Sequence, residues 1–319
     1  MTTLIGLAAL AMHVSLMLAL APVLVGFIRW TRARLMGRIG PSVWQPWRDL
    51  LRLARKQPVL AENASWLFRA APATAFAATL AAAALVPGFA LGMATAPLSD
   101  LLAIIGLLTF ARCTLALAGL DTGTAFGGIG AARDMTYATF AEPAMLLVIF
   151  TLALLVGTTN LDAIAQMLRE AAVGLRVSLG LALVAILAVA IAENGRIPVD
   201  NPATHLELTM VHEAMVLEYS ARHLALIDWA AALKLLLWMT LIVAIFAPFG
   251  TADAESGLLV WLLAVPAWGL KVGVLAAVLA AFESATAKMR VFRVPEFLGV
   301  ALLLGVLAAV FLFVSQGFV

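Results

Sequence analysis

Eight long apolar stretches constrain the fold of this chain more than any other feature of its sequence. They lie at residues 4–28, 70–93, 100–120, 138–157, 177–192, 224–247, 258–282 and 298–316. A helix needs about 20 apolar residues to cross a bilayer, and lipid leaves backbone polar groups no partner outside the helix, so each stretch predicts one transmembrane helix. The fifth stretch is short, and we expect it to be tilted or extended by its flanks. The prediction is therefore an all-α integral membrane protein with about eight transmembrane helices in a single domain, 1–319.

The composition agrees with a membrane location. Apolar residues make up 64% of the chain and charged residues 12%, and the mean hydropathy is +1.06, far from the values of soluble proteins. The first apolar stretch has no positively charged residues before it and is too long for a signal peptide, so we expect it to stay as a spanning helix. The single cysteine, Cys113, excludes an internal disulfide framework and a thiolate metal site.

The basic residues are divided unequally between the loops. Fifteen of the 20 Lys and Arg residues lie in the odd-numbered loops, and nine of these lie between the first two helices, at 29–69. The even-numbered loops contain only Arg169 and Arg176. The positive-inside rule therefore places the odd-numbered loops in the cytoplasm and both termini on the outer side.

The loop at 29–69, here called the platform loop, contains the segment "WQPWRDLLRLARKQ". Its tryptophan and leucines alternate with cations at helical spacing, which predicts an amphipathic helix in the membrane interface. The preceding "GRIGPSVWQP" predicts an irregular loop, because glycine and proline interrupt helices. Two interpretations stay open for the cations: anchoring to lipid headgroups, or docking of a soluble partner.

The fifth loop, 193–223, is acidic and reads "ENGRIPVDNPATHLELTMVHEAMVLEYS" over its first 28 residues. Asn201 and Pro202 fit a helix cap and first turn, which predicts a helix over about 202–219. Its apolar residues occur on all sides, so we expect it to be buried in protein; a solvated loop is the alternative. His212 and Glu213 begin like a zinc-protease motif, but Val216 occupies the position of the second histidine, which argues against a zinc site.

Single charged residues interrupt or flank the apolar stretches, namely Arg112, Glu142, Glu193, Lys234 and Lys271. A charge at the bilayer centre costs about 2.5 to 3.5 kcal/mol on insertion scales, so several in one chain indicate internal pairing or hydration. A proton or ion path is the usual reason. For the two lysines a structural salt bridge is an equal alternative.

Four segments resemble one protein family: "GRIGPSVWQPWRDLLRLARKQ" (37–57), "AFGGIGAARDMTYATFAEPAMLL" (125–147), the acidic fifth-loop segment (193–220) and "AKMRVFRVPEFLGVALLL" (287–304). They are similar to the membrane subunits of formate hydrogenlyase-type, energy-converting nickel–iron hydrogenases, which are homologous to the H subunit of bacterial complex I. Four blocks in order along the chain are far more specific than one short motif.

The resemblance implies a non-catalytic subunit of an oxidoreductase complex in the bacterial cytoplasmic (inner) membrane. Its partners would be hydrogenase-like large and small subunits and iron–sulfur subunits on the cytoplasmic face, antiporter-like membrane subunits beside it, and the lipid bilayer; no nucleic acid is expected. The chain would bind no cofactor or metal, and the nickel–iron or quinone site and the iron–sulfur clusters would belong to partner subunits.

The resemblance also implies roles for residues. Glu142 matches an acid of the fourth helix, Glu193, Asp200, Glu207 and Glu218 match acids of the fifth loop, and Arg38, Arg133 and Arg196 match cations near the arm interface. Together with the charges noted above, the predicted proton path comprises Glu142, Glu193, Asp200, Glu207, Glu213, Glu218, Lys234 and Lys271. The predicted interface with the peripheral arm comprises Arg38, Arg48, Arg52, Arg55, Lys56, Arg133, Arg196, Arg290 and Arg293.

Other functions stay open at this point. The fifth-loop segment is three residues longer than the usual complex I stretch, and "KMRVFRVPEF" replaces an R-x-R-x-D run, which favours the hydrogenase branch over a quinone-reducing subunit. A stand-alone ion transporter would not need the platform loop. A purely structural anchor would explain the platform loop but not the buried acids.

Overall fold

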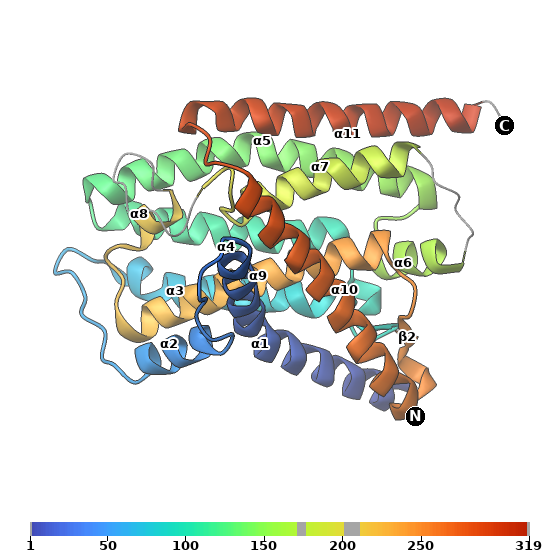
Figure 1. Ribbon diagram of the computed structural model, residues 1–319, viewed down its shortest axis with the longest axis horizontal. Helices are drawn as coiled ribbons and strands as arrows, with labels where there is room; N and C mark the ends of the chain where they lie inside the picture. Colours follow the sequence, from blue (N-terminus) through green and yellow to red (C-terminus); the bar gives the residue numbers. More distant parts are fainter. Residues whose placement is uncertain (1, 171–176, 201–210, 318–319) are drawn as a thin grey trace.

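The computed structural model describes residues 2–170, 177–200 and 211–317, and these are almost entirely helical (Figure 1). The helices are α1 Thr2–Leu35, α2 Gln45–Ala54, α3 Trp66–Leu85, α4 Leu101–Asp121, α5 Ala125–Val156, α6 Leu161–Glu170, α7 Val177–Glu193, α8 His212–Val216, α9 Ala221–Phe246, α10 Leu258–Ala285 and α11 Val294–Gly317. Two strands, β1 Ala90–Leu91 and β2 Ala252–Asp253, and three short 3-10 turns, Ala96–Leu98, Ala254–Ser256 and Val291–Arg293, complete the described elements.

Each apolar stretch of the sequence corresponds to one helix of the bundle. Seven of these helices are long and apolar enough to cross a membrane, and the eighth, α7, is apolar but only 17 residues long. The prediction of an all-α integral membrane protein is confirmed. Helix α9 is the most enclosed of the seven and packs against α1, α2 and α3, so it forms the centre of the bundle.

The loops gather at two opposite ends. Both chain ends, α6 and β2 lie at one end in Figure 1, here called the even-loop end. There β1 and β2 pair in parallel, with the register Ala90–Ala252 and Leu91–Asp253. Both carboxylate oxygens of Asp162 in α6 accept the amide N–H of Gly92 at 3.1 Å, which ties α6 to the loop after β1.

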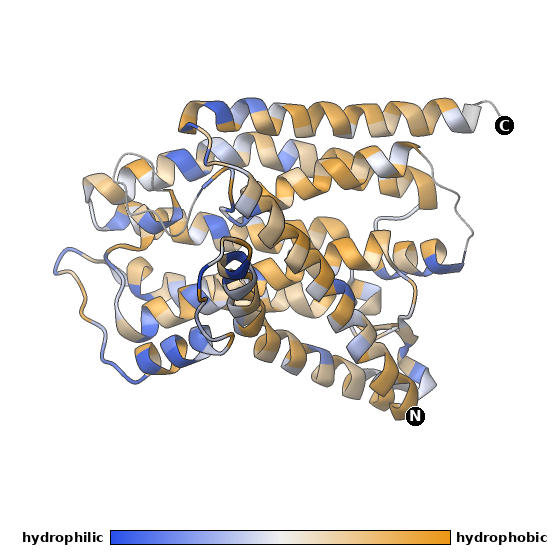
Figure 2. Cartoon of the chain, viewed as in Figure 1, coloured by the Kyte–Doolittle hydropathy of each residue, from blue (hydrophilic) through white to orange (hydrophobic). Residues whose placement is uncertain are grey.

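The opposite end, here called the odd-loop end, contains the platform loop, α2, α8 and the start of α11 (Figure 1). The platform loop contacts the fifth loop, because the Val59 amide donates to Ser220 Oγ at 2.9 Å. The fifth loop contacts the seventh through Lys288 Nζ and Asp200 Oδ1, 2.6 Å apart. Figure 2 shows hydrophilic residues gathered in the platform loop and α2, whereas the long helices are mostly hydrophobic.

The largest differences from the predicted helix limits have identifiable reasons. The second apolar stretch was expected to be helical to residue 93, but α3 ends at Leu85 because Pro87 forces Val86 into an extended conformation (φ −84°, ψ 120°). The fourth was expected to begin at 138, but α5 begins at Ala125, capped by Thr124, whose Oγ1 accepts the Gly127 amide. The third loop, including Arg133, is therefore mostly helix.

Two glycines at the start of α5 permit close helix packing. A Cβ at Gly127 would lie 2.1 Å from the Gly119 carbonyl oxygen, and a Cβ at Gly130 would lie 2.9 Å from that of Val211. Glycine therefore permits α5 to approach the backbone of α4 and of the fifth loop.

The helix predicted over 202–219 falls partly on residues 201–210, which lie outside the described residues. In the part that follows, Val211 has non-helical dihedral angles (φ −120°, ψ −79°) and helix α8 covers only His212–Val216. The helix thus ends three residues before the expected limit. Its residues Ala214, Met215 and Val216 are buried, so the prediction of a buried fifth-loop helix is confirmed in a shorter form.

The close approach of α4 and α5 predicts a sharp contrast between adjacent glycines. Gly127→Ala should lower the midpoint of thermal unfolding in detergent, because overpacking typically costs about 1 to 3 kcal/mol and the obstructing atom here is backbone. Gly128→Ala should not lower the midpoint, because a Cβ there meets no atom within 4 Å and alanine favours a helix more than glycine does. Equal midpoints for the two variants would contradict the packing assignment.

Candidate functional site

Five charged side chains from four helices meet inside the bundle and form what we call the buried ionic cluster: Arg112, Asp134, Glu142, Glu193 and Lys234. The carboxylate of Glu193, at the end of α7, is its most enclosed member, with 5% of the side chain exposed. One oxygen forms a close ion pair with the Arg112 guanidinium of α4, and the other lies 2.9 Å from Lys234 Nζ of α9. Glu193 therefore links three helices through two cations.

Helix α5 supplies the acids on the other side of Arg112. Asp134 Oδ2 lies 3.5 Å from Arg112 Nε, and Glu142 Oε1 lies 3.8 Å from Arg112 Nη1. Thr109 Oγ1, one turn before Arg112, donates a hydrogen bond to Glu142 at 3.2 Å. Glu142 is the least enclosed acid of the cluster, with 34% of its side chain exposed.

The cluster holds three carboxylates and two cations. In an environment of low dielectric constant an unbalanced charge is expensive, and one added proton would neutralise the set. Glu193 contacts both cations, whereas Asp134 and Glu142 share Arg112. An added proton is therefore expected on one of the two α5 acids, Asp134 or Glu142.

A second ionic group lies at the odd-loop end, around Glu283 of α10. Its carboxylate is 3.8 Å from Arg32 Nη1 of α1 and 3.4 Å from Arg196 Nη1 of the fifth loop. Burial lowers the pKa of Arg196 from its ordinary value, and the neighbouring Arg29 and Arg32 act in the same direction, although Glu283 opposes them. Arginine remains charged even so, and the group joins three segments distant in sequence.

Tyr137 lies between the fifth loop and the buried ionic cluster. It interacts electrostatically with Asp200 of the fifth loop and with Asp134 of the cluster. Its hydroxyl is buried and has no hydrogen-bond partner among the described residues. A tyrosine hydroxyl can both donate and accept a hydrogen bond, so Tyr137 is a polar group available between the two segments.

The structure brings together some of the predicted proton-path residues and separates others. Glu142, Glu193 and Lys234 share the cluster, whereas Asp200 pairs with Lys288 outside it. Glu213 is half-buried, Glu218 is exposed and Glu207 lies outside the described residues. Lys271 lies at the even-loop end, where Nζ donates to the carbonyls of Ala247 and Phe249 at 3.0 and 2.7 Å.

The predicted arm-interface cations mostly point outward at the odd-loop end. Arg38, Arg48, Arg52, Arg55, Lys56, Arg290 and Arg293 are exposed, whereas Arg133 and Arg196 are half-buried. Helix α2 packs inward through its apolar face. Leu50 is buried, and Trp47 Nε1 donates to the Ala19 carbonyl at 3.0 Å.

The sequence argument missed Asp134, Tyr137 and Glu283. Asp134 and Tyr137 fell in the segment assigned to the third loop, and Glu283 lies one residue beyond the predicted limit of the seventh helix. Asp228 of α9, which interacts electrostatically with His212, Glu213 and Arg29, was missed as well. A helix prediction extended to 125 would have placed Asp134 and Glu142 about two turns apart on α5.

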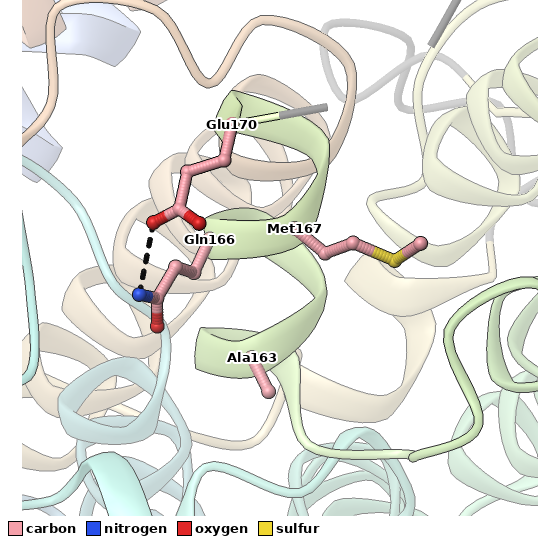
Figure 3. A pocket seen from close by; sticks show the side chains of 4 residues that line it. All are labelled: Ala163, Gln166, Met167 and Glu170. Carbon is pink, nitrogen blue, oxygen red and sulfur yellow. Dashed lines mark hydrogen bonds between the residues drawn. The ribbon is translucent and has the colours of Figure 1, made fainter. Parts of the chain in front are cut away.

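Other features of the described residues offer weaker candidate sites. A surface hollow of about 400 Å³ lies on α6, where Gln166 donates to Glu170 at 3.0 Å. In Figure 3 Met167 points away from this pair. Among the described residues that line the hollow, Glu170 is the one titratable side chain. Within ranges 2–170, 177–200 and 211–317, no three His, Cys, Asp or Glu side chains are grouped so that they could hold a metal ion.

Comparison with known proteins gives matches over most of the chain. A family model described as NADH dehydrogenase matches residues 7–314. Formate hydrogenlyase subunit 4 of Escherichia coli (strain K12) is 33% identical over 279 residues, which cover 87% of this chain and 89% of that protein. Hydrogenase-4 component C of the same strain is 36% identical over 243 residues, covering 76% and 75%.

More distant matches extend the comparison. The H subunit of the NADH-quinone oxidoreductase of Rickettsia bellii (strain OSU 85-389) is 29% identical over 214 residues, covering 63% of this chain and 62% of that protein. A chain of the membrane-bound sulfane sulfur reductase, an archaeal respiratory membrane complex, aligns with a TM-score of 0.81 over 96% of this chain and 99% of that chain. At 19% identity this likeness shows the fold alone.

The geometry around Glu193 predicts a specific pattern of stability. Glu193→Gln should destabilise the protein by about 3 kcal/mol, because Lys234 loses its only salt bridge among the described residues. Adding Lys234→Met should recover most of this loss, because the unpaired cation is then gone. Thermal unfolding in detergent measures both variants, and the proposed pairing fails if the single variant unfolds like the parent protein or the double variant is no better than the single.

Proposed function

The chain belongs to the NADH dehydrogenase family, and on that premise we propose that it is a membrane subunit of a hydrogenase-like respiratory complex that passes protons through its buried ionic cluster. The odd-loop end would face the cytoplasm and dock the peripheral arm, in which iron–sulfur clusters and a nickel–iron site are held by partner subunits. Antiporter-like membrane subunits would receive the protons.

One observation carries this proposal: three carboxylates and two cations share a site at the middle of α4, α5 and α9. One added proton would neutralise this set, so we take its excess acid as a place for an exchangeable proton. Glu193 is fixed by Arg112 and Lys234, so Glu142 is the acid we assign to hold that proton, with Thr109 as a hydrogen-bond partner.

A line of polar groups leads from the odd-loop end to this site. Asp200 pairs with Lys288 of the seventh loop, at 2.6 Å, and lies within electrostatic range of Tyr137. Tyr137 in turn interacts with Asp134 of the cluster. A charge that appears in a docked arm could act on these groups, because a nearby charge can move the pKa of a carboxylate by one unit or more, and each unit corresponds to about 1.4 kcal/mol.

The surface at the odd-loop end supports a protein partner. Arg48 and Arg52 on the outward face of α2 and Arg55 at its C-cap follow one another at helical spacing. Two large apolar side chains next to other cations are almost fully exposed, Ile39 at 94% beside Arg38 and Phe292 at 91% near Arg293. Apolar residues surrounded by charges are typical of a surface that another protein covers.

The docking proposal is tested by charge reversal on α2. Replacing Arg48, Arg52 and Arg55 with Glu should release the soluble subunits during purification while the membrane subunit still inserts, because the other odd-numbered loops keep their cations. Replacing the same three residues with Lys preserves the charge and should retain the arm. An arm that stays bound to the Glu variant at moderate salt would favour lipid anchoring as the role of these cations.

The proton-transfer proposal is tested at Glu142. Glu142→Gln keeps the size and hydrogen bonding of the side chain but cannot titrate, so proton translocation in vesicles should fall on the order of 10²-fold, as for the loss of one proton-transfer group. Glu170→Gln removes an exposed carboxylate at the even-loop end and should pump normally. Unchanged pumping by an assembled Glu142→Gln complex would refute the relay, and loss of assembly would indicate a structural role.

A further inference from the structure

An apolar groove with cations at its rim lies between α2, α3 and α9. It has a volume of about 380 Å³. Apolar side chains of α2 and α9 form much of its lining: Trp47, Leu50, Leu51, Leu226 and Trp229. Arg69 of α3 and Arg222 of α9 line it as well, and none of its lining residues is acidic.

The tryptophans give the groove fixed apolar walls. Trp47 Nε1 donates to the Ala19 carbonyl at 3.0 Å, and Trp229 Nε1 donates to the Leu18 carbonyl at 3.1 Å. The two rings meet edge to face, with centroids 5.5 Å apart. Because both indole N–H groups are already bonded within the protein, the rings offer apolar surface to whatever occupies the groove.

The two arginines lie at the depth where phospholipid phosphates are expected. Arg69 is the fourth residue of α3 and Arg222 the second residue of α9, and both helices enter the bundle from the odd-loop end. Both side chains are exposed, and neither forms a salt bridge within the described part of the chain. The positive ends of two helix dipoles add to their charge.

We propose that this groove binds an anionic phospholipid, with its phosphate between Arg69 and Arg222 and one acyl chain against the tryptophan and leucine wall. Free phosphate would use the arginines but leave the apolar wall exposed, and a neutral amphiphile would use the wall but leave two cations unpaired. Basic pockets between transmembrane helices recognise acidic lipid headgroups in this way. Because α2 forms one wall, a bound lipid would hold α2 against α3 and α9. This inference does not depend on the proton path.

Binding is measured on the purified complex in neutral detergent, from the fluorescence anisotropy of a labelled short-chain phosphatidylglycerol. Unlabelled phosphatidylglycerol should displace the probe, whereas phosphatidylcholine of the same chain length and inorganic phosphate should not at equal concentration. Replacing Arg69 and Arg222 with Gln should weaken binding about 30-fold, since each cation near the headgroup contributes about fivefold. Replacing both with Lys should preserve most of the affinity.

Two further variants distinguish specific binding in the groove from non-specific association of the probe with detergent or with other surfaces. Arg34→Gln removes an exposed cation outside the groove and should not change binding. Ala73→Phe fills the groove from α3 without altering its charge and should abolish the displaceable signal. The proposal is overturned if the Arg69 and Arg222 double Gln variant binds like the parent, if phosphatidylcholine competes equally, or if a neutral quinone analogue displaces the probe and phosphatidylglycerol does not.

Discussion

The ion pairs of Glu193 with Arg112 and Lys234 are the interaction on which the arrangement of the helices depends. Each of these charges would cost several kcal/mol if it faced lipid alone. The cost is avoided only when α4, α7 and α9 place their charges against one another, which fixes both their order and their depth in the bundle. Helix α5 completes the set because Gly119 and Gly127 allow it to approach α4 closely enough for Asp134 and Glu142 to reach Arg112.

The same physical requirement organises the odd-loop end. Glu283 lies between Arg32 and Arg196, so the end of α10 is tied to the end of α1 and to the fifth loop. Asp200 is tied to Lys288 in the seventh loop. A displacement of one of these segments would therefore move the others. Tyr137, which interacts electrostatically with Asp200 and Asp134, lies between the fifth loop and the buried ionic cluster. This arrangement is consistent with the proposal that a change of charge in a docked partner alters proton binding at the cluster inside the membrane.

The sequence alone predicted the helices that cross the membrane, because a bilayer leaves a long apolar stretch few alternatives to a helix. It did not predict the helix limits where a helix continues beyond its apolar stretch, as at the arginine-rich end of α1 and the glycine-rich start of α5. Short elements such as α6, β1 and β2 have no hydropathy signal of their own. The isolated charges Glu142, Glu193 and Lys234 were recognised as unusual, and the structure places them together.

The pairing of those charges could not be derived from the sequence, because it depends on which helices are neighbours. Asp134 and Glu283 were missed for the simpler reason that they fell in segments assigned to loops. The role of the glycines at the start of α5, which permit the close contact with α4, was also not predicted. The excess of one carboxylate over the cations, which underlies the proposed function, became visible only when all five side chains were located.

The central claim is that this cluster holds one exchangeable proton on Glu142. Infrared difference spectroscopy of the whole complex, recorded between its oxidised and reduced states, measures this directly through the carbonyl stretch of a protonated carboxyl group. The account predicts a redox-dependent band of this kind that shifts in deuterated water and disappears in Glu142→Gln. A band that persists unchanged in Glu142→Gln, or the absence of any such band in the parent complex, would contradict it.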